Sequence, residues 1–319
     1  MKTAVFEYGK QPLSEWIKAN QDCEKMILKG QVYFDLWTDN FSYEVKDHKG
    51  MHAFRREINI GWDAFDLLCG YDRIAKDFHP KEFDITDMHL LDYDGNVNDI
   101  DLPYDVDEEQ PSIIFKMLAN RKYSTRFICD GDYVTTPDKK VLIHCGPMKE
   151  TITVPNGIET VGRIAFGGIR EFGFNVILPE GVAFIDECAF SGSDGLVQIN
   201  FPDSLKALGE SAFFGTSLKE VTLPEGIKEI PACCFQYVYI EKIHFPANLK
   251  AIKDCAFVGL GCDEVRLPET VETVGHWSLG GDYKILYVPK TIEEFPHDFY
   301  YEEGIDDNYE EYKPIIVKY

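Results

Sequence analysis

The sequence predicts a mixed α+β region followed by a β-solenoid of about seven repeats. A short apolar phrase that ends in proline returns seven times between residues 151 and 301. The steps between these prolines are 24, 23, 22, 22, 22 and 21 residues. A nearly fixed period of this length is the signature of a solenoid. The seven prolines are Pro155, Pro179, Pro202, Pro224, Pro246, Pro268 and Pro289.

Each repeat begins with a predicted strand. Apolar residues stand three and one positions before the proline, as Val221 and Leu223 do before Pro224. This alternation has a period of two, which indicates a strand with one buried face. The residues between the apolar ones face outward and form what we call the outward ladder: Thr153, Ile177, Asn200, Thr222, His244, Arg266 and Tyr287.

The rest of each repeat supplies core columns. Apolar residues recur three and six positions after the proline, and an aromatic residue follows at position eleven. The residue just before that aromatic is small in the first six repeats, which lets neighbouring coils pack without a void. The aromatic column comprises Phe166, Phe190, Phe213, Phe235 and Phe257, with Leu279 in the sixth repeat and Phe299 one position early in the seventh.

Two repeats show the pattern most fully: Val176–Phe190 reads VILPEGVAFIDECAF and Val221–Phe235 reads VTLPEGIKEIPACCF. Both resemble the BspA-like class of leucine-rich repeat, and the resemblance extends over about residues 127–301. It implies a right-handed leucine-rich-repeat solenoid of short strands and turns, used in that family for protein binding and adhesion at bacterial surfaces. Leu279 and the shortened seventh repeat depart from the pattern, as expected of a terminal repeat that turns into a cap.

Residues 1–125 are expected to form a mixed α+β domain of no recognised family. A strand is predicted over Gln31–Trp37 from its alternating apolar residues, and Tyr43–Lys46 is expected to pair with it. Apolar residues at helical spacing predict three helices, over Pro12–Lys29, Gly61–Phe78 and Pro111–Arg121.

Both ends of the repeat block, residues 151–301, are expected to carry caps. Two turn dipeptides separate three apolar runs within residues 126–150, which is typical of a small antiparallel unit. This segment resembles the hairpin that precedes BspA-like repeats, and it would cover the first coil. Residues 302–319 are expected to form the opposite cap or tail, with a closing strand in Pro314–Tyr319.

An acidic segment between residues 84 and 109 contains no Lys or Arg. Clustered carboxylate and amide oxygens suit hard cations. The weak candidates for metal ligands are Asp92, Asp94, Asn96 and Asp99. Counting from the first of these, Val97 stands where a calcium loop needs Gly, and Pro103 stands where it needs Glu. The preferred interpretation is therefore a hairpin that turns at Gly95, or a solvated acidic loop.

Charge and hydropathy restrict the classes of partner. The net charge of −23 argues against nucleic acid and anionic membrane surfaces, because both need clustered Lys and Arg. No stretch approaches the roughly 18 apolar residues of a membrane span, and Glu7 interrupts the apolar run at the amino terminus. We expect no membrane insertion and a cytoplasmic location as the sequence stands, with the cell surface or secretion as the alternative if a native leader was removed.

Three cysteines share one position in the repeat. Cys188, Cys233 and Cys255 each follow a repeat proline by nine residues, and Ser211 takes this position in the third repeat. The preferred interpretation is a small, largely buried side chain; the alternative is a disulfide or metal ladder between neighbouring coils. The odd total of nine cysteines and the absence of a Cys-x-x-Cys spacing weaken the alternative, so we expect reduced thiols.

The function predicted from these patterns is binding rather than catalysis. The chain has none of the common hydrolase, nucleotide-binding or metalloprotease motifs, so we expect no enzyme and no cofactor. His144 is expected to be an exposed strand position. We expect a scaffold that binds a protein or extended peptide on the outward ladder, where His244, Arg266 and Tyr287 form the most distinctive run. The alternative is an enzymatic or cation-dependent amino-terminal domain, with the repeats as its targeting arm.

Overall fold

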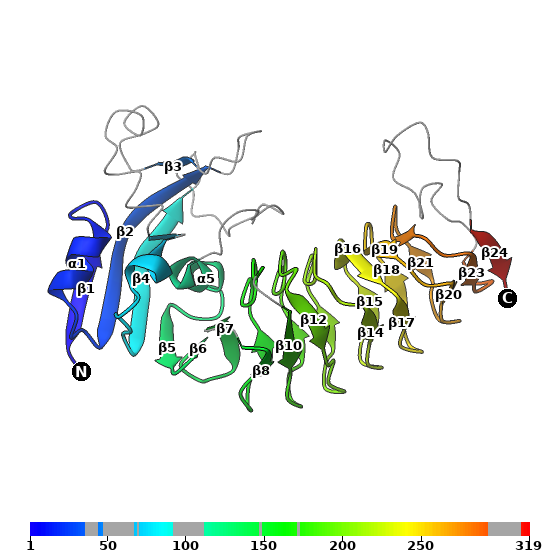
Figure 1. Ribbon diagram of the computed structural model, residues 1–319, viewed down its shortest axis with the longest axis horizontal. Helices are drawn as coiled ribbons and strands as arrows, with labels where there is room; N and C mark the ends of the chain where they lie inside the picture. The colour runs from blue at the N-terminus through cyan, green and yellow to red at the C-terminus, as the bar shows by residue number, and fades with distance from the viewer. Residues whose placement is uncertain are drawn as a thin grey trace. The chain divides into compact units, whose positions relative to one another are not determined.

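The computed structural model describes residues 1–35, 44–46, 67–68, 70–91, 112–146, 149–170, 173–292 and 314–319. The chain divides into two compact units, Met1–Gly146 and Pro147–Tyr319. Strands make up most of the regular structure of both units, and the described helices are short segments of the first (Figure 1). The chain is therefore a β-solenoid type of structure with little helix.

Parallel strands form the centre of the first unit (Figure 1). β1 (Thr3–Glu7) pairs with β2 (Lys25–Asp35), and β2 pairs on its other side with β4 (Glu82–Leu91). The helix α1 (Leu13–Ala19) connects the first two strands and buries its apolar face. The short β3 (Glu44–Lys46) pairs antiparallel with β2, which confirms the pairing that the sequence predicts.

The helix predicted over Pro12–Lys29 is wrong in its second half. It ends at Ala19, and the residues that follow lead into β2. Met26 and Leu28 are buried, whereas the residues between and beside them are partly exposed, which is the alternation of a strand. Hydrogen bonding to β1 and β4 on both sides selects this conformation over the helical one.

The described residues of the first unit include two further helices with defined bounds. α5 (Ile113–Ala119) confirms the helix predicted around Pro111–Arg121, and the Ser112 hydroxyl caps it by accepting a hydrogen bond from the Phe115 N–H at 3.3 Å. Only the four-residue α4 (Tyr71–Ile74) is a complete helix in the described part of the second predicted one. The candidate metal ligands all lie outside the described residues: Asp92, Asp94, Asn96 and Asp99.

An antiparallel meander ends the first unit. β5 (Arg126–Asp130) pairs with β4, β6 (Tyr133–Thr135) pairs with β5, and β7 (Val141–Cys145) pairs with β6. This confirms the small antiparallel unit that the sequence predicts. Leu142 on β7 is fully buried, so the meander shares the apolar interior of the first unit.

Each coil of the second unit contributes a strand that ends beside its repeat proline. Where equivalent strands of successive coils pair, they pair in parallel, as Val221 pairs with Ile243, and in Figure 1 the strands stack side by side along the unit. These strands are β8 (Thr151–Thr153), β10 (Phe174–Ile177), β12 (Leu196–Ile199), β14 (Glu220–Thr222), β17 (Lys242–His244), β20 (Glu264–Arg266) and β23 (Ile285–Val288).

Two further sets of strands complete the coils. Two-residue strands follow the prolines, namely β9 (Thr160–Val161), β11 (Phe184–Ile185), β13 (Ala207–Leu208), β15 (Glu229–Ile230), β18 (Ala251–Ile252) and β21 (Thr273–Val274). A separate sheet comprises β16 (Phe235–Ile240), β19 (Phe257–Leu260) and β22 (Leu279–Gly281). β24 (Ile315–Lys318) pairs in parallel with β23 and confirms the predicted closing strand.

The aromatic column is a continuous stack of phenylalanine rings. Neighbouring ring centroids are 4.7, 5.1, 5.2 and 5.2 Å apart, and the planes differ by only 7°, 7°, 3° and 2°. Every ring is at most 1% exposed. The stack therefore confirms the core column, and its members are Phe166, Phe190, Phe213, Phe235 and Phe257.

The ninth residue after the proline turns the chain through a left-handed backbone in six coils. This conformation costs a non-glycine residue about 1–2 kcal/mol. Hydrogen bonds between coils hold it, because the N–H of Cys233 donates to the carbonyl of Asp254 at 3.0 Å and Cys255 repeats this contact one coil later. This left-handed column comprises Ile164 (φ 55°), Cys188 (54°), Ser211 (54°), Cys233 (55°), Cys255 (55°) and Trp277 (49°).

Candidate binding surface

The outward ladder faces solvent along the second unit. Thr153, Ile177, Asn200, Thr222, His244 and Arg266 are exposed, and Tyr287 is half-buried. The strands that carry the ladder fall into three sheets, β12-β10-β8, β14-β17 and β20-β23-β24. Within each sheet the ladder residues are register partners, as Thr222 is of His244 and Arg266 is of Tyr287.

Asn200 is the ladder member with a structural task. It follows the last residue of β12, where the backbone ladder stops. Its amide replaces the missing backbone groups, because its Nδ2 donates to the Leu178 carbonyl at 2.8 Å and its Oδ1 accepts from the Leu178 N–H at 2.7 Å. This side chain is committed to its neighbouring coil, so it contributes little to recognition.

Arg266 lies over two tyrosine rings. The guanidinium carbon is 4.0 Å from the ring centroid of Tyr287 and 4.7 Å from that of Tyr319. The Tyr319 hydroxyl donates to the Leu267 carbonyl, and the backbone N–H of Tyr319 donates to the Val288 carbonyl at 3.0 Å. These two hydrogen bonds fix the position of the Tyr319 ring. Stacking on two aromatic faces orients the guanidinium and limits its rotamers.

Sequence reasoning did not assign Tyr319 to this site. It belongs to no repeat, and only the parallel pairing of β24 with β23 brings it to Arg266. The aromatic ending of the predicted closing strand was the available signal, but its register was not predictable. We call Arg266, Tyr287 and Tyr319 the arginine clamp.

The sheet β16-β19-β22 carries a pair of exposed aromatic side chains. Tyr237 and Tyr239 on β16 are 55% and 50% exposed. The Lys219 ammonium lies 4.6 Å from the ring centroid of Tyr239, and the ring rests where a Cβ at Gly261 would stand. The sequence around these tyrosines alternates as in a strand, but nothing in it predicted that the chain forms the sheet β16-β19-β22 here.

Several other cations of the second unit are paired with acids on a neighbouring coil. The Lys250 ammonium lies 2.6 Å from a Glu272 oxygen, and the Lys284 ammonium lies 2.8 Å from an Asp263 oxygen. The buried Arg163 pairs with Glu187 at 2.7 Å. Within the described part of the chain no carboxylate lies within ion-pair distance of Arg266, whose contacts are the two aromatic rings. The arginine clamp therefore differs from the structural ion pairs around it.

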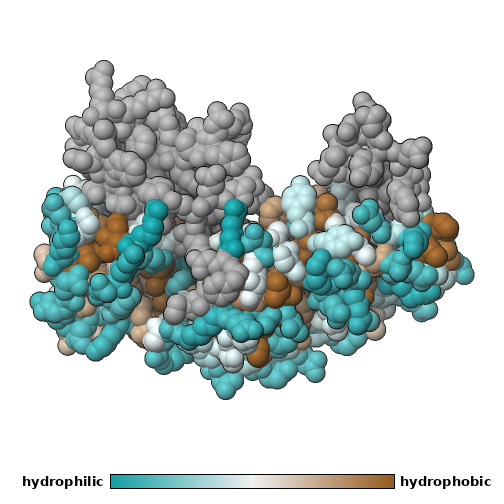
Figure 2. Space-filling model, viewed as in Figure 1, coloured by the Kyte–Doolittle hydropathy of each residue, from teal (hydrophilic) through white to brown (hydrophobic). Residues whose placement is uncertain are grey.

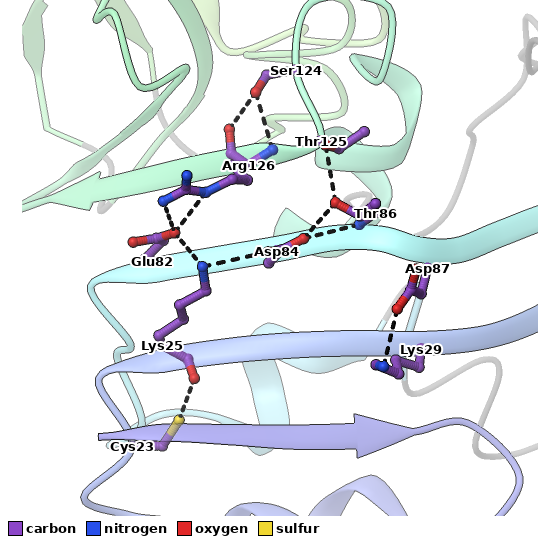
Figure 3. Close-up of polar contacts among 10 residues, drawn as sticks. All are labelled: Cys23, Lys25, Lys29, Glu82, Asp84, Thr86, Asp87, Ser124, Thr125 and Arg126. Atoms are coloured by element: carbon purple, nitrogen blue, oxygen red, sulfur yellow. Dashed lines mark hydrogen bonds and ion pairs between the residues drawn. The ribbon is translucent and has the colours of Figure 1, made fainter. Parts of the chain in front are cut away.

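The first unit holds a compact ion-pair cluster on three adjacent strands. Figure 3 shows Lys25 of β2 and Arg126 of β5 reaching Glu82 of β4 from either side. One oxygen of Glu82 accepts from Lys25 Nζ at 2.7 Å and from Arg126 Nη2 at 2.5 Å. Burial raises the pKa of Glu82, but the two cations outweigh it and hold the pKa below its usual value. A carboxylate that is fully ionised and hydrogen-bonded in this way fastens strands together and is a poor proton acceptor.

Lys116 and His144 form a second, buried polar contact. Lys116 on α5 is 2% exposed, and its ammonium lies 3.3 Å from Nδ1 of His144 on β7. Burial lowers the pKa of Lys116 to about 8, with partial compensation by the Asp72 carboxylate. Burial and the Lys116 charge lower the pKa of His144 well below its usual value. The prediction that His144 is an exposed strand position is wrong, because its ring is partly buried against α5.

The surface of the second unit in Figure 2 is mostly hydrophilic, with separate hydrophobic patches. Among the described helices, none is both long enough and apolar enough to span a membrane. No group of three or more His, Cys, Asp or Glu side chains comes together as a metal site in the described ranges. The outward ladder, with the arginine clamp at one end, is thus the most developed candidate for recognition.

Comparisons with solved structures give weak overall likenesses. A leucine rich cell surface protein from Faecalibacterium prausnitzii A2-165 is 19% identical, with coverage of 53% of this chain and 56% of that one and a TM-score of 0.39. A leucine-rich repeat protein from Bacteroides ovatus ATCC 8483 is 19% identical, with coverage of 60% and 64% and a TM-score of 0.34. The pneumococcal vaccine antigen PcpA is 19% identical, with coverage of 47% and 42% and a TM-score of 0.30.

The chain thus spans 56% of the length of the first of these structures and 64% of the second. No curated protein matches the chain. The family model for the BspA type leucine rich repeat region matches in six copies, over residues 135–261 and 174–286. These residues include the phenylalanine stack and all six members of the left-handed column. Residues 135–286 are therefore a BspA-type leucine-rich repeat region.

Proposed function

We propose that the repeat unit is a non-enzymatic scaffold that binds a protein or an extended peptide along the outward ladder. The observation that carries this proposal is the arginine clamp, in which Arg266 lies over Tyr287 and Tyr319. Arg and Tyr are among the residues that most often supply binding energy in interfaces. A side chain that is already oriented loses less conformational entropy when a partner binds.

The clamp favours a partner that presents hydrogen-bond acceptors. In the described residues the Arg266 guanidinium contacts two aromatic rings, and no side-chain or backbone acceptor engages the N–H donors along its edge. A peptide carboxylate or main-chain carbonyl matches this edge. Neighbouring strands stand about 4.8 Å apart, so seven coils offer a ladder about 30 Å long, which suits an extended segment. Because the chain carries a net charge of −23, a partner with a local carboxylate in an otherwise neutral or basic segment fits best.

A peptide-display selection on the immobilised full chain tests the proposal. Peptides selected with the unchanged protein are expected to lose at least tenfold in affinity with Arg266→Ala. Lys206→Ala is the matched control, because it removes an exposed cation of the same unit that is not part of the outward ladder, and it should change the affinity little. Binding that persists in Arg266→Ala but is lost in Tyr239→Ala would place the site on the sheet β16-β19-β22 instead. If no peptide binds to the full chain above background, this result would count against a peptide scaffold.

The alternative role for the first unit, an enzyme or a cation-dependent module, gains no support from the described residues. Lys116 has the lowered pKa that a catalytic amine needs, but it is 2% exposed and its ammonium faces His144. One carboxylate oxygen of Glu82 already accepts hydrogen bonds from both Lys25 and Arg126. Repeating the peptide selection with and without calcium separates the two roles, because a scaffold that acts through the clamp is expected to ignore calcium.

A further inference from the structure

Cys233 and Cys255 occupy equivalent places in successive coils. Both have φ of 55°, and their N–H groups donate to Asp254 and His276 of the following coils at 3.0 and 2.8 Å. Two residues further on, Phe235 and Phe257 are register partners in β16 and β19. The two backbones therefore run side by side, at a strand spacing of about 4.8 Å. This spacing falls inside the window of about 4.4–6.8 Å between the Cα atoms of a disulfide.

The side chains of this pair also meet. The side chain of Cys255 interacts with the Cys233 thiol, and the two cysteines, which are not joined in a disulfide, are of intermediate exposure. The other places in the left-handed column lack such a partner, since Cys188 is buried beside Ser211 and Trp277 follows Cys255. The column thus brings one pair of accessible thiols face to face in the described coils.

We propose that Cys233 and Cys255 are a redox modification site that closes as a disulfide between the two coils when the protein meets a small-molecule disulfide such as oxidised glutathione. One protein thiol loses its proton to solvent, attacks a sulfur of the oxidant and releases one glutathione thiol. The second protein thiol then loses its proton, attacks the protein sulfur of the mixed disulfide and releases the second glutathione. Two protein thiols are oxidised, and one oxidised glutathione is reduced to two thiols.

The surroundings of the pair determine how it reacts. Burial, together with Cys255 and the acids Glu210 and Asp254, raises the pKa of Cys233 to about 12, so little thiolate exists at neutral pH. Closure is therefore expected to be slow at pH 7 and to accelerate several-fold for each pH unit toward 9.

The site is tested on the reduced full chain, incubated with oxidised glutathione at pH 8.5 and mapped by non-reducing peptide mass spectrometry. We expect one cross-link, two hydrogens lighter than the sum of its peptides, joining the peptide that contains Cys233 to the one that contains Cys255. Each of Cys233→Ser and Cys255→Ser should abolish it, and Cys188→Ser is the matched control that should leave it unchanged. Because trypsin leaves Cys234 and Cys262 on the same two peptides, Cys234→Ala and Cys262→Ala must both retain the cross-link.

Several results would overturn the proposal. A cross-link that survives in Cys233→Ser, a product that stops at the glutathione mixed disulfide, or a cross-link that forms only in urea would each show that the folded pair does not close. Thermal unfolding provides a second measurement, because the oxidised protein should unfold at a higher temperature than the reduced one. Dithiothreitol should reverse this shift in the unchanged protein and should have no effect in Cys255→Ser.

Discussion

The guanidinium of Arg266 stacks on the ring of Tyr287, its register partner on the next coil, at 4.0 Å. We expect Arg266→Ala to lower the free energy of unfolding by only about 1 kcal/mol, because the contact lies on the surface. Affinity for a selected peptide should fall by at least tenfold. Arg266→Lys keeps the charge but loses the planar fork, so it should recover only part of the affinity. Calorimetric titration and urea unfolding of the same samples separate the two effects, and equal losses in both would contradict a recognition role.

Phe213 stands in the middle of the phenylalanine stack, with Phe190 and Phe235 at 5.1 and 5.2 Å. Replacement by Ala leaves a cavity between two rings, and we expect a loss of about 3–5 kcal/mol in the free energy of unfolding. Phe213→Leu fills part of the space and should cost less. Urea unfolding monitored by circular dichroism provides the measurement. A loss below about 1 kcal/mol for Phe213→Ala would contradict the core assignment.

Ser211 combines two unfavourable features of the left-handed column. Its φ is 54°, and its fully buried hydroxyl has no hydrogen-bond partner in the described structure. Ser211→Gly removes both, and the greater freedom of glycine in the unfolded chain offsets part of the gain. We expect a net stabilisation of about 1 kcal/mol by thermal unfolding. Ser211→Ala is the control that removes the hydroxyl alone, and an equal gain from both variants would show that the backbone conformation is not strained.

Lys116 should make the free energy of unfolding of the first unit vary with pH in the alkaline range. Its folded pKa of about 8 lies below the unfolded value of about 10.4, so the unfolded chain binds the proton more tightly between these values. Stability should therefore rise as pH increases from about 8 to about 10. Lys116→Met keeps the side-chain volume without a buried charge, so it should raise the stability at pH 7 by roughly 2–3 kcal/mol and flatten the alkaline limb. Urea unfolding between pH 7 and 10 gives the comparison, and a decrease in stability at pH 7 would contradict the account.

Glu82 should act at the opposite end of the pH range. Its folded pKa is lowered, so the stabilisation by Lys25 and Arg126 is complete above the unfolded pKa of about 4.3 and is lost as the pH falls below it. Glu82→Gln cannot form the ion pairs at any pH, and we expect it to be about 1–2 kcal/mol less stable at pH 7. The unfolding free energies of the two proteins should converge toward pH 3. Curves that stay parallel down to that pH would show that Glu82 does not drive the acid limb.

The repeats were predictable because their information is local and recurs. Phe190 and Phe213 stand at the same offset from their prolines, so one assignment fixed the whole column. The first unit offered no repetition. The start of β2, residues 25–29, is predicted as helix although the rest of the strand is predicted correctly, because the partners β1 and β4 that select the strand are distant in sequence. Lys116 and His144 lie on different elements, and nothing local in either segment announces their contact.

The candidate surface shows the same division. The outward positions of the ladder follow from strand alternation, and the structure exposes six of the seven. The structural task of Asn200 depends on where β12 ends, and the place of Tyr319 depends on the register of β24. Such facts arise from pairing between segments, which a pattern along one segment does not contain.

The hydrogen bonds that hold the left-handed column run only between adjacent coils, and this has a mechanical consequence. Pulled from the carboxyl terminus, the repeat unit should yield one coil at a time, since each coil is held by its immediate neighbour. A coil of 22 residues releases about 75 Å of chain when it opens, so the force record should be a regular sawtooth. A bond between Cys233 and Cys255 would shield the residues between them from load, and one tooth of that record should disappear.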